Sequence, residues 1–220
     1  MNMNMNRLPV PTWNHLGVNF APDKAALPQV PANGWGTAAA TAAVPAGIRT
    51  NGPETEIFET FTESGMGVAA DAFLAANANV KEHLAVGEGA AIETPAVFEV
   101  KLDEAHPCAL SCLTIDAAKD SSLTVVQVVR GDAEGGVSAN LTRIRAAEGA
   151  HVVLVQVQLL GNRARRWNAV AIEQGTSARV EQVRIELGGS VVACGARPLL
   201  THNTCEYDLE PTYFGHGNDM

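Results

Sequence analysis

A series of short apolar segments with no helical pattern between them, beginning after Pro95, restricts the fold more than any other feature of the sequence. The segments are rich in Val, Ile and Leu and are separated by Gly, Asn, Asp or Ser, as β-strands are. They are Val97–Leu102, Cys112–Asp116, Leu123–Arg130, Ala139–Arg145, Val152–Leu159, Ala169–Glu173, Val180–Leu187 and Val191–Cys194. Because an α/β fold needs a helix of about ten or more residues between parallel strands, the sequence favours a mainly β fold.

Several of these segments also resemble one another. Three of them align on Gln127, Gln156 and Gln182, with intervals of 29 and 26 residues, and Gly149 and Gly175 each lead a turn before a strand. Such a repeat, with several short strands per unit and no helix, is typical of one coil of a parallel β-helix. We therefore predict a right-handed parallel β-helix (solenoid) core of roughly four coils over residues 95–220, incomplete at its C-terminal end. An antiparallel β-sandwich is the alternative, since its loops recur at similar spacing.

The first 94 residues have a different character, which predicts an irregular and helical N-terminal region. Residues 21–52 are rich in Ala, Gly, Thr and Pro, so we expect an irregular arm without regular strands, with Trp35 favouring an arm that wraps over the body of the protein. Pro53 begins a short predicted helix with acidic residues in its first turn.

A second predicted helix starts at Val68. Apolar residues repeat from there at three-to-four spacing as far as about Val80. This pattern places His83 and Leu84 in the exit turn of the helix.

Composition narrows the possible partners and the compartment. The 15 Lys and Arg residues against 24 Asp and Glu residues give a formal charge of −9, which argues against a nucleic-acid or anionic-membrane binder. No apolar run approaches the ~18–20 residues that span a bilayer, and the start resembles no export signal. We expect a cytoplasmic protein whose four cysteines remain thiols.

Two groups of residues contain the side chains that metals prefer. Cys194, His202 and Cys205 form the first candidate metal site, and Cys108 and Cys112, with His106 nearby, form the second. The spacing is unlike that of common zinc sites, and cysteine is frequently just a small buried apolar residue.

A dense basic patch is predicted in a turn between two strands. It consists of Arg163, Arg165, Arg166 and Trp167. Because a turn projects from the side of a solenoid, these residues are candidates for binding an acidic partner. The alternative is a solvated loop with Trp167 tucked over the next coil.

Three further motifs bear on catalysis. Gly65–Ala70 has the form of a dinucleotide fingerprint, but the preceding residues are too polar for the buried strand that the motif requires. The chain has no phosphate-binding loop of the G-x-x-x-x-G-K-[ST] type, so we expect no ATP hydrolysis. Glu206 and Asp208 are the one carboxylate pair suited to a polysaccharide lyase or other carbohydrate-binding β-helix.

The segments Arg7–Asn19, Phe73–Val86 and Ser138–Leu200 together resemble the SufB/SufD family, and within it SufD, a scaffold of the SUF iron–sulfur cluster assembly system. The resemblance implies a helical N-terminal region, a parallel β-helix core and no enzymatic activity. It also implies pairing with a SufB-like protein and a SufC-like ATPase. Such a scaffold holds no stable cofactor and carries at most a transient iron–sulfur cluster at the shared interface.

The segment Tyr213–Met220 resembles the middle of the family's core. The resemblance thus implies that the last coils and the C-terminal helices are absent from this chain, and none of the family's functional residues is carried over. An unfinished solenoid exposes the strand edges of its last coil. We expect this open end to pair with a SufB-like protein or with a second copy of the chain.

Overall fold

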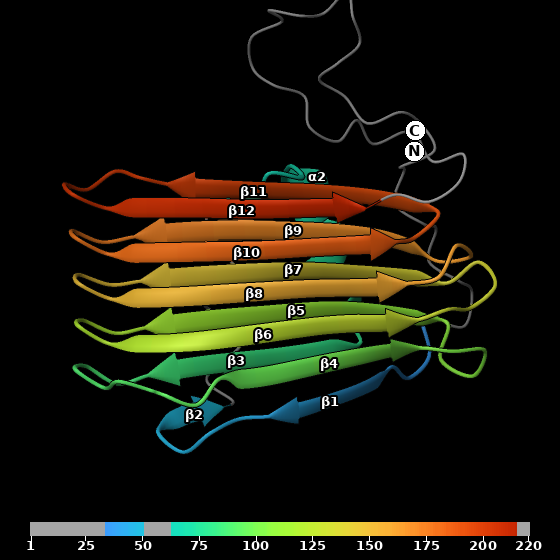
Figure 1. Cartoon of the computed structure of the whole chain (residues 1–220), viewed down its shortest axis with the longest axis horizontal. Coiled ribbons are helices and arrows are strands. Elements are labelled where there is room, and N and C mark those ends of the chain that lie inside the picture. Colours follow the sequence, from blue (N-terminus) through green and yellow to red (C-terminus); the bar gives the residue numbers. More distant parts are fainter. Residues whose placement is uncertain (1–33, 51–62, 215–220) are drawn as a thin grey trace, which may run out of the picture.

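Strands pair in parallel from coil to coil in the computed structural model, which describes residues 34–50 and 63–214. Each coil adds one strand to each of two facing sheets (Figure 1). Sheet A contains β4 (Ala96–Leu102), β6 (Ser122–Gly131), β8 (His151–Leu160), β10 (Arg179–Gly188) and β12 (Glu206–Phe214). Sheet B contains β3 (Val80–Val86), β5 (Cys108–Ala117), β7 (Val137–Ala146), β9 (Arg165–Gln174) and β11 (Val191–Leu199).

The chain is therefore mainly β, with a β-solenoid, as the sequence predicts, but the solenoid has about five turns where the sequence predicts roughly four coils. All eight predicted segments lie within strands, and the antiparallel sandwich is wrong, because these strands pair in parallel. The stack starts before residue 95, since β3 already pairs in parallel with β5. His83 and Leu84 consequently lie in a strand and not in the exit turn of a helix.

The register corrects the predicted repeat by two residues in one coil. Gln127 lies opposite Gln156 as predicted, but Gln156 lies opposite Arg184, not Gln182. The two-residue difference arises at the corners between strands. Gly149 has a positive φ of 68° at the corner before β8, whereas the equivalent corner before β10 is formed by Ser177, with φ 56°. Aligning Gly149 with Gly175 shifts the coil, since the conformation of the corner, not its residue type, is repeated.

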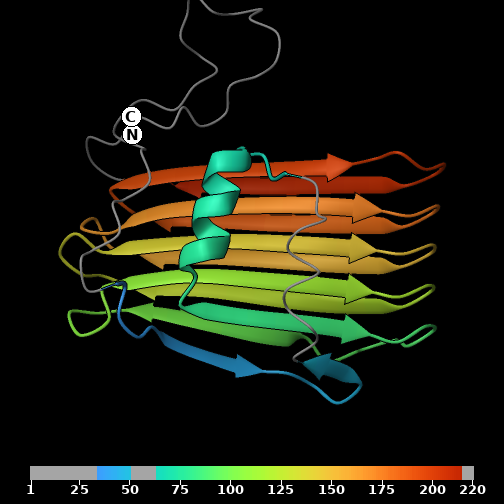
Figure 2. The ribbon, with the colours of Figure 1, turned by 180° about the vertical axis from the view of Figure 1, so that it is seen from behind.

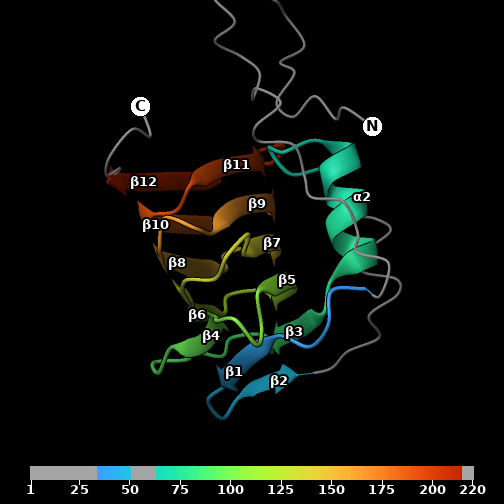
Figure 3. The ribbon, with the colours of Figure 1, turned by 90° about the vertical axis from the view of Figure 1, so that its right-hand side faces the viewer.

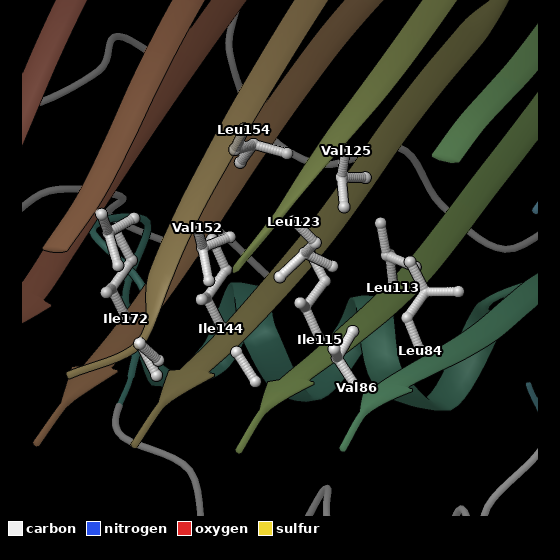
Figure 4. Packing of buried hydrophobic residues seen from close by; sticks show 14 of the residues in the cluster. Leu84, Val86, Leu113, Ile115, Leu123, Val125, Ile144, Val152, Leu154 and Ile172 are labelled. Carbon is white, nitrogen blue, oxygen red and sulfur yellow. The ribbon is translucent and has the colours of Figure 1, made fainter. Parts of the chain in front are cut away.

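Columns of apolar side chains fill one half of the solenoid interior. Leu84, Ile115, Ile144 and Ile172 stand in register on four successive strands of sheet B and are fully buried. Leu123 and Val152 belong to the same cluster from sheet A (Figure 4). Equal rises from coil to coil let similar side chains stack on one another, so this half of the core is continuous along the axis.

Two short strands cover the first coil. β1 (Ala39–Ala43) pairs antiparallel with β4, and β2 (Ile48–Thr50) pairs antiparallel with β3. The prediction of an arm without strands is therefore wrong for this part of residues 21–52. Alanine and threonine side chains contribute little here, but the edges of β4 and β3 offer unpaired backbone groups, and pairing with them selects the extended conformation.

Helix α2 (Val68–Asn77) covers the outer face of sheet B. It runs across the strands (Figure 2) and lies on the side away from sheet A (Figure 3). Many outward side chains beneath it are small or apolar, among them Cys112, Ala139 and Trp167, and the buried Arg143 faces Asp71 of the helix. Because both faces of sheet B are covered, its central strands are buried at almost every position, whereas those of sheet A alternate.

The arm does contact the body of the protein through Trp35, as predicted. The ring of Trp35 meets that of Phe73 on α2 edge to face, with 6.2 Å between ring centroids. The predicted helix that starts at Pro53 lies outside the described residues, as does Arg7–Asn19. No helix in the described part of the chain is long and apolar enough to span a membrane.

Two glycines let the segment before α2 lie directly on β11. A Cβ at Gly65 would be 2.6 Å from the backbone nitrogen of Ala196, and a Cβ at Gly195 would be 2.5 Å from the carbonyl carbon of Gly65. Gly67, with φ 94°, then turns the chain into the helix. This contact joins two parts of the chain that are far apart in the sequence.

We predict that Gly195→Ala destabilises the fold by about 1–3 kcal/mol, because the new methyl group has to displace the backbone of Gly65. Gly87→Ala is the matched control, since nothing lies within 4 Å of a Cβ at that position, and a change within about 0.5 kcal/mol is expected. Urea unfolding followed by circular dichroism measures both. Equal stability of the two variants would show that the glycine contact is not tight.

Candidate functional site

A row of polar side chains runs through the inside of the solenoid between two apolar clusters, and we call it the polar seam. Along β8, for example, Val152 and Leu154 are apolar, Gln156 and Gln158 are polar, and Leu160 is apolar again, although all five side chains are buried. The members of the seam are Gln127, Ser138, Asn140, Thr142, Gln156, Gln158, Arg166, Asn168, Gln182, Arg184 and Glu186.

Amide side chains connect successive coils along the seam. Gln156 donates to Gln127 Oε1 at 2.7 Å, and Gln182 donates to Gln156 Oε1 at 2.8 Å. The hydroxyl group of Tyr207 in the last coil donates to Gln182 Oε1 at 2.7 Å. Buried amides normally need such partners, so the chain of hydrogen bonds crosses the stack from β6 to β12.

A second set of bonds ties sheet B to the same seam. Asn140 donates to Asn168 Oδ1 at 2.8 Å, and Asn168 donates to Gln156 Oε1 at 3.1 Å and to Glu186 Oε1 at 3.2 Å. The seam is thus a cross-linked network and not a set of separate pairs, which makes its members energetically dependent on one another.

A cavity of about 80 Å³ lies at the N-terminal end of the seam. Glu82, Gln127, Asn140 and Arg166 contribute to its wall, and residues of β1 cover it. Asn140 Oδ1 and Arg166 Nε are buried without a hydrogen-bond partner. A polar space of this size has room for ordered water, which would satisfy such atoms.

Charged side chains gather in the C-terminal coils of the seam, from which Arg166 reaches the wall of the cavity. Arg166 lies 4.0 Å from Glu186, measured from Nε to Oε2, and both side chains are 2 % exposed. Burial lowers the pKa of Arg166, the largest effect, and the Glu186 carboxylate opposes it. Burial and the same carboxylate raise the pKa of the Cys194 thiol to about 12. Cys194 is therefore a neutral thiol that donates to Glu186 Oε1 at 3.4 Å.

The last coil has an edge with no strand on it in the described part of the chain. β12 pairs with β10 on one side only, and most of its residues are exposed. Leu209, Tyr213 and Phe214 are 36 %, 54 % and 68 % exposed, respectively. The antiparallel cap at the first coil has no counterpart here among the described residues.

The structure does not bring together the predicted metal site. Among the described residues no three His, Cys, Asp or Glu side chains could hold a metal ion. Cys194 points into the seam, while the thiol of Cys205 donates to the backbone carbonyl of His202 at 3.1 Å. Binding of metal by these residues with the help of another chain stays a prediction.

The predicted basic patch is divided among three environments. Arg163 lies in the turn and pairs with Asp132 at 2.8 Å, whereas residues 165–167 belong to strand β9. Arg166 points into the seam, and Trp167 is fully buried beneath α2, with Arg165 over its ring at 5.5 Å. Alternation along a strand sends neighbours to opposite faces, so Arg166 and Trp167 cannot form an exposed patch. Partner binding through Arg163 and Arg165 stays a prediction.

The remaining motifs have structural explanations. Gly65–Ala70 supplies the close contact with β11 and the start of α2, and the described residues directly before it, Glu63 and Ser64, are not in a strand. Cys112 is buried under α2, and His106 bonds to Asp103. The carboxylates of Glu206 and Asp208 both lie near the guanidinium group of Arg179, at 3.8 Å and 3.3 Å.

The polar seam can be recognised in the sequence from the phase of its polar residues within the strands. Gln127, Gln156 and Arg184 occupy one inward column, and Gln158 and Glu186 occupy the next. Polar residues at every second position, in phase with buried neighbours, indicate interior positions. An alignment on strand phase finds them, whereas an alignment on glycines does not.

We expect Cys194 to resist alkylation in the native protein, because iodoacetamide reacts with the thiolate and the raised pKa keeps this thiol protonated at pH 8. Glu186→Gln should increase its reactivity by removing the opposing carboxylate, whereas Glu181→Gln, on the outer face of the same strand, should not. Peptide mapping by mass spectrometry measures the rate for Cys194 alone. A native rate equal to that in guanidinium chloride would contradict the burial described above.

One comparison with known proteins identifies a family. The sequence matches the family described as "SUF system FeS cluster assembly, SufBD core domain" over residues 100–220, which is more than half of its 220 residues. No curated protein and no solved structure matches the chain. The matched range begins in β4 and contains the seam from Gln127 to Glu186. The chain therefore belongs to the SufBD core family of the SUF system, and its role lies in iron–sulfur cluster assembly.

Proposed function

We propose that the chain is a non-catalytic scaffold subunit of the SufD type, which pairs with a SufB-like protein and works with a SufC-like ATPase in the cytoplasm. The family match supports the pathway. The unpaired edge of β12 is the observation that carries the pairing. A strand edge beside exposed apolar side chains is an incomplete surface, and another chain can complete it.

The chemistry of that edge favours a partner strand over a loose contact. Backbone N–H and C=O groups on the open side of β12 offer main-chain hydrogen bonds, except at Pro211, which has no N–H. Leu209 and Tyr213 stand in register with the inward residues Gln182 and Glu186. Another β-helix would continue both the ladder and the interior columns. A SufB-like protein with the same fold fits this requirement.

In this proposal the iron–sulfur cluster is cargo, assembled at the interface and passed on. The cysteines of the described solenoid do not form a complete ligand set with its histidines and carboxylates, so a partner has to contribute ligands. The polysaccharide lyase alternative has no comparable support, since Glu206 and Asp208 are engaged by Arg179 and the family match is to a different function.

Co-expression with the SufB-like and SufC-like proteins of the same genome tests the proposal. We expect a tagged form of this chain to retain both proteins through affinity purification and size-exclusion chromatography. Leu209→Lys should weaken retention of the SufB-like protein at least about tenfold, because it places a charge on the interior column of the open coil. Val68→Lys is the control, since Val68 is equally apolar and 67 % exposed but lies on α2.

If Leu209→Lys and Val68→Lys retain the SufB-like protein equally well, the interface does not include β12. If neither protein is retained by the unchanged chain, the proposed pairing is wrong, although membership of the family stands on the sequence match.

A further inference from the structure

The buried charges at the C-terminal end of the polar seam do not balance. Arg166 and Arg184 are 2 % and 5 % exposed, and Glu186 is 3 % exposed. Glu186 pairs with Arg166, at 4.0 Å, and no described carboxylate forms an ion pair with Arg184. Arg143 is also buried, but it lies on the outer face of sheet B, where its charge acts on the Asp71 carboxyl group of α2. It is therefore not part of the cluster inside the solenoid.

Other groups that could supply negative charge nearby are neutral. The thiol of Cys194 and the phenol of Tyr207 each have a pKa raised to about 12, chiefly by burial, and burial raises the pKa of Tyr213 as well. Gln156, Asn168 and Gln182 are amides. Among the described residues, Arg184 therefore has no carboxylate partner within ion-pair distance, while the half-buried Glu82 lies with Arg166 on the wall of the cavity. A buried charge without such a partner is costly.

Hydrogen bonding around Arg184 is also incomplete. Arg184 Nη2 donates to the Tyr213 hydroxyl group, and the guanidinium group lies over the Tyr213 ring at 5.4 Å. Its Nε and Nη1 atoms are buried without a hydrogen-bond partner. Two acceptors of the cluster, Glu186 Oε2 and Gln158 Oε1, are also buried without one, and Glu186 Oε2 lies 4.0 Å from Arg166 Nε. Unsatisfied guanidinium N–H groups in an interior are rare unless a ligand or ordered water completes them.

We propose that Arg184, assisted by Arg166, forms a binding site for a small inorganic oxyanion at the C-terminal end of the seam. An oxyanion supplies both the missing negative charge and acceptors for the free N–H groups, and guanidinium groups favour oxyanions for their planar array of donors. Arg184 lies one coil below β12, opposite Pro211, so the site is next to the open coil. This site goes beyond the proposed scaffold role and does not depend on it.

Thermal unfolding of the full chain in sodium phosphate, against sodium chloride at equal ionic strength, tests the site. Because only the folded state binds, phosphate at about ten times its Kd should raise the melting temperature by about 3–5 °C. Arg184→Gln should abolish this difference. Arg179→Gln should keep it, since Arg179 carries the same charge on the same strand but on the exposed outer face.

A carboxylate introduced by mutation next to the two arginines provides a second test. This test does not depend on whether Arg184→Gln folds. Cys194 lies within the field of Arg166, Arg184 and Glu186. If the cluster has a surplus positive charge, Cys194→Asp should melt above Cys194→Asn in chloride and should lose the response to phosphate. If Glu186 already balances the cluster, the added carboxylate repels it and the order reverses.

Three results would overturn the site. One is a wild-type melting temperature that is the same in phosphate and chloride. The second is an undiminished phosphate response in Arg184→Gln, and the third is a Cys194→Asp variant that melts below Cys194→Asn. None of these measurements involves a partner protein, so their failure is separable from failure of the proposed pairing.

Discussion

Parallel, in-register stacking is the constraint on which the rest of this structure depends. Each inward side chain rests on its counterpart one coil below, as Ile144 does between Ile115 and Ile172. A column therefore accepts only residues that are compatible with the side chains above and below. Where one position in a column is polar, the positions next to it on the neighbouring coils have to be polar as well. The interior separates for this reason into apolar columns and a polar seam that each run through several coils.

Much of the fold can be predicted from the sequence because strand phase is local information. The alternation in Leu123–Arg130 and Val152–Leu159 specifies strands, and the absence of helices between them leaves few architectures. The cap could not be predicted in the same way. Ala39–Ala43 has little preference for a strand, and it is extended because the edge of β4 is available to it. Similarly, Val80–Val86 was hidden by the apolar spacing of the helix before it.

The candidate site was less predictable, since its chemistry depends on which face each residue takes. Arg165, Arg166 and Trp167 are adjacent in the sequence, yet one stacks on a ring, one enters the seam and one lies beneath a helix. Likewise, Cys194 and Cys205 are neighbours in the sequence only, since Cys194 bonds to Glu186 in the seam and Cys205 bonds to the backbone of His202. The glutamines at 127 and 156 were recognised as a repeat, but their role as interior hydrogen-bonding partners requires the register.

The antiparallel strands β1 and β2 give the stack a direction. They pair antiparallel with the edges of β4 and β3, so no further parallel coil can pair directly with these two strands. The two ends of the described stack therefore differ, so parallel pairing at β12 would not be repeated by the same pairing at the first coil. The parallel stack is in this way closed to direct extension at its first coil, and among the described residues it can continue in parallel only from the edges of β11 and β12.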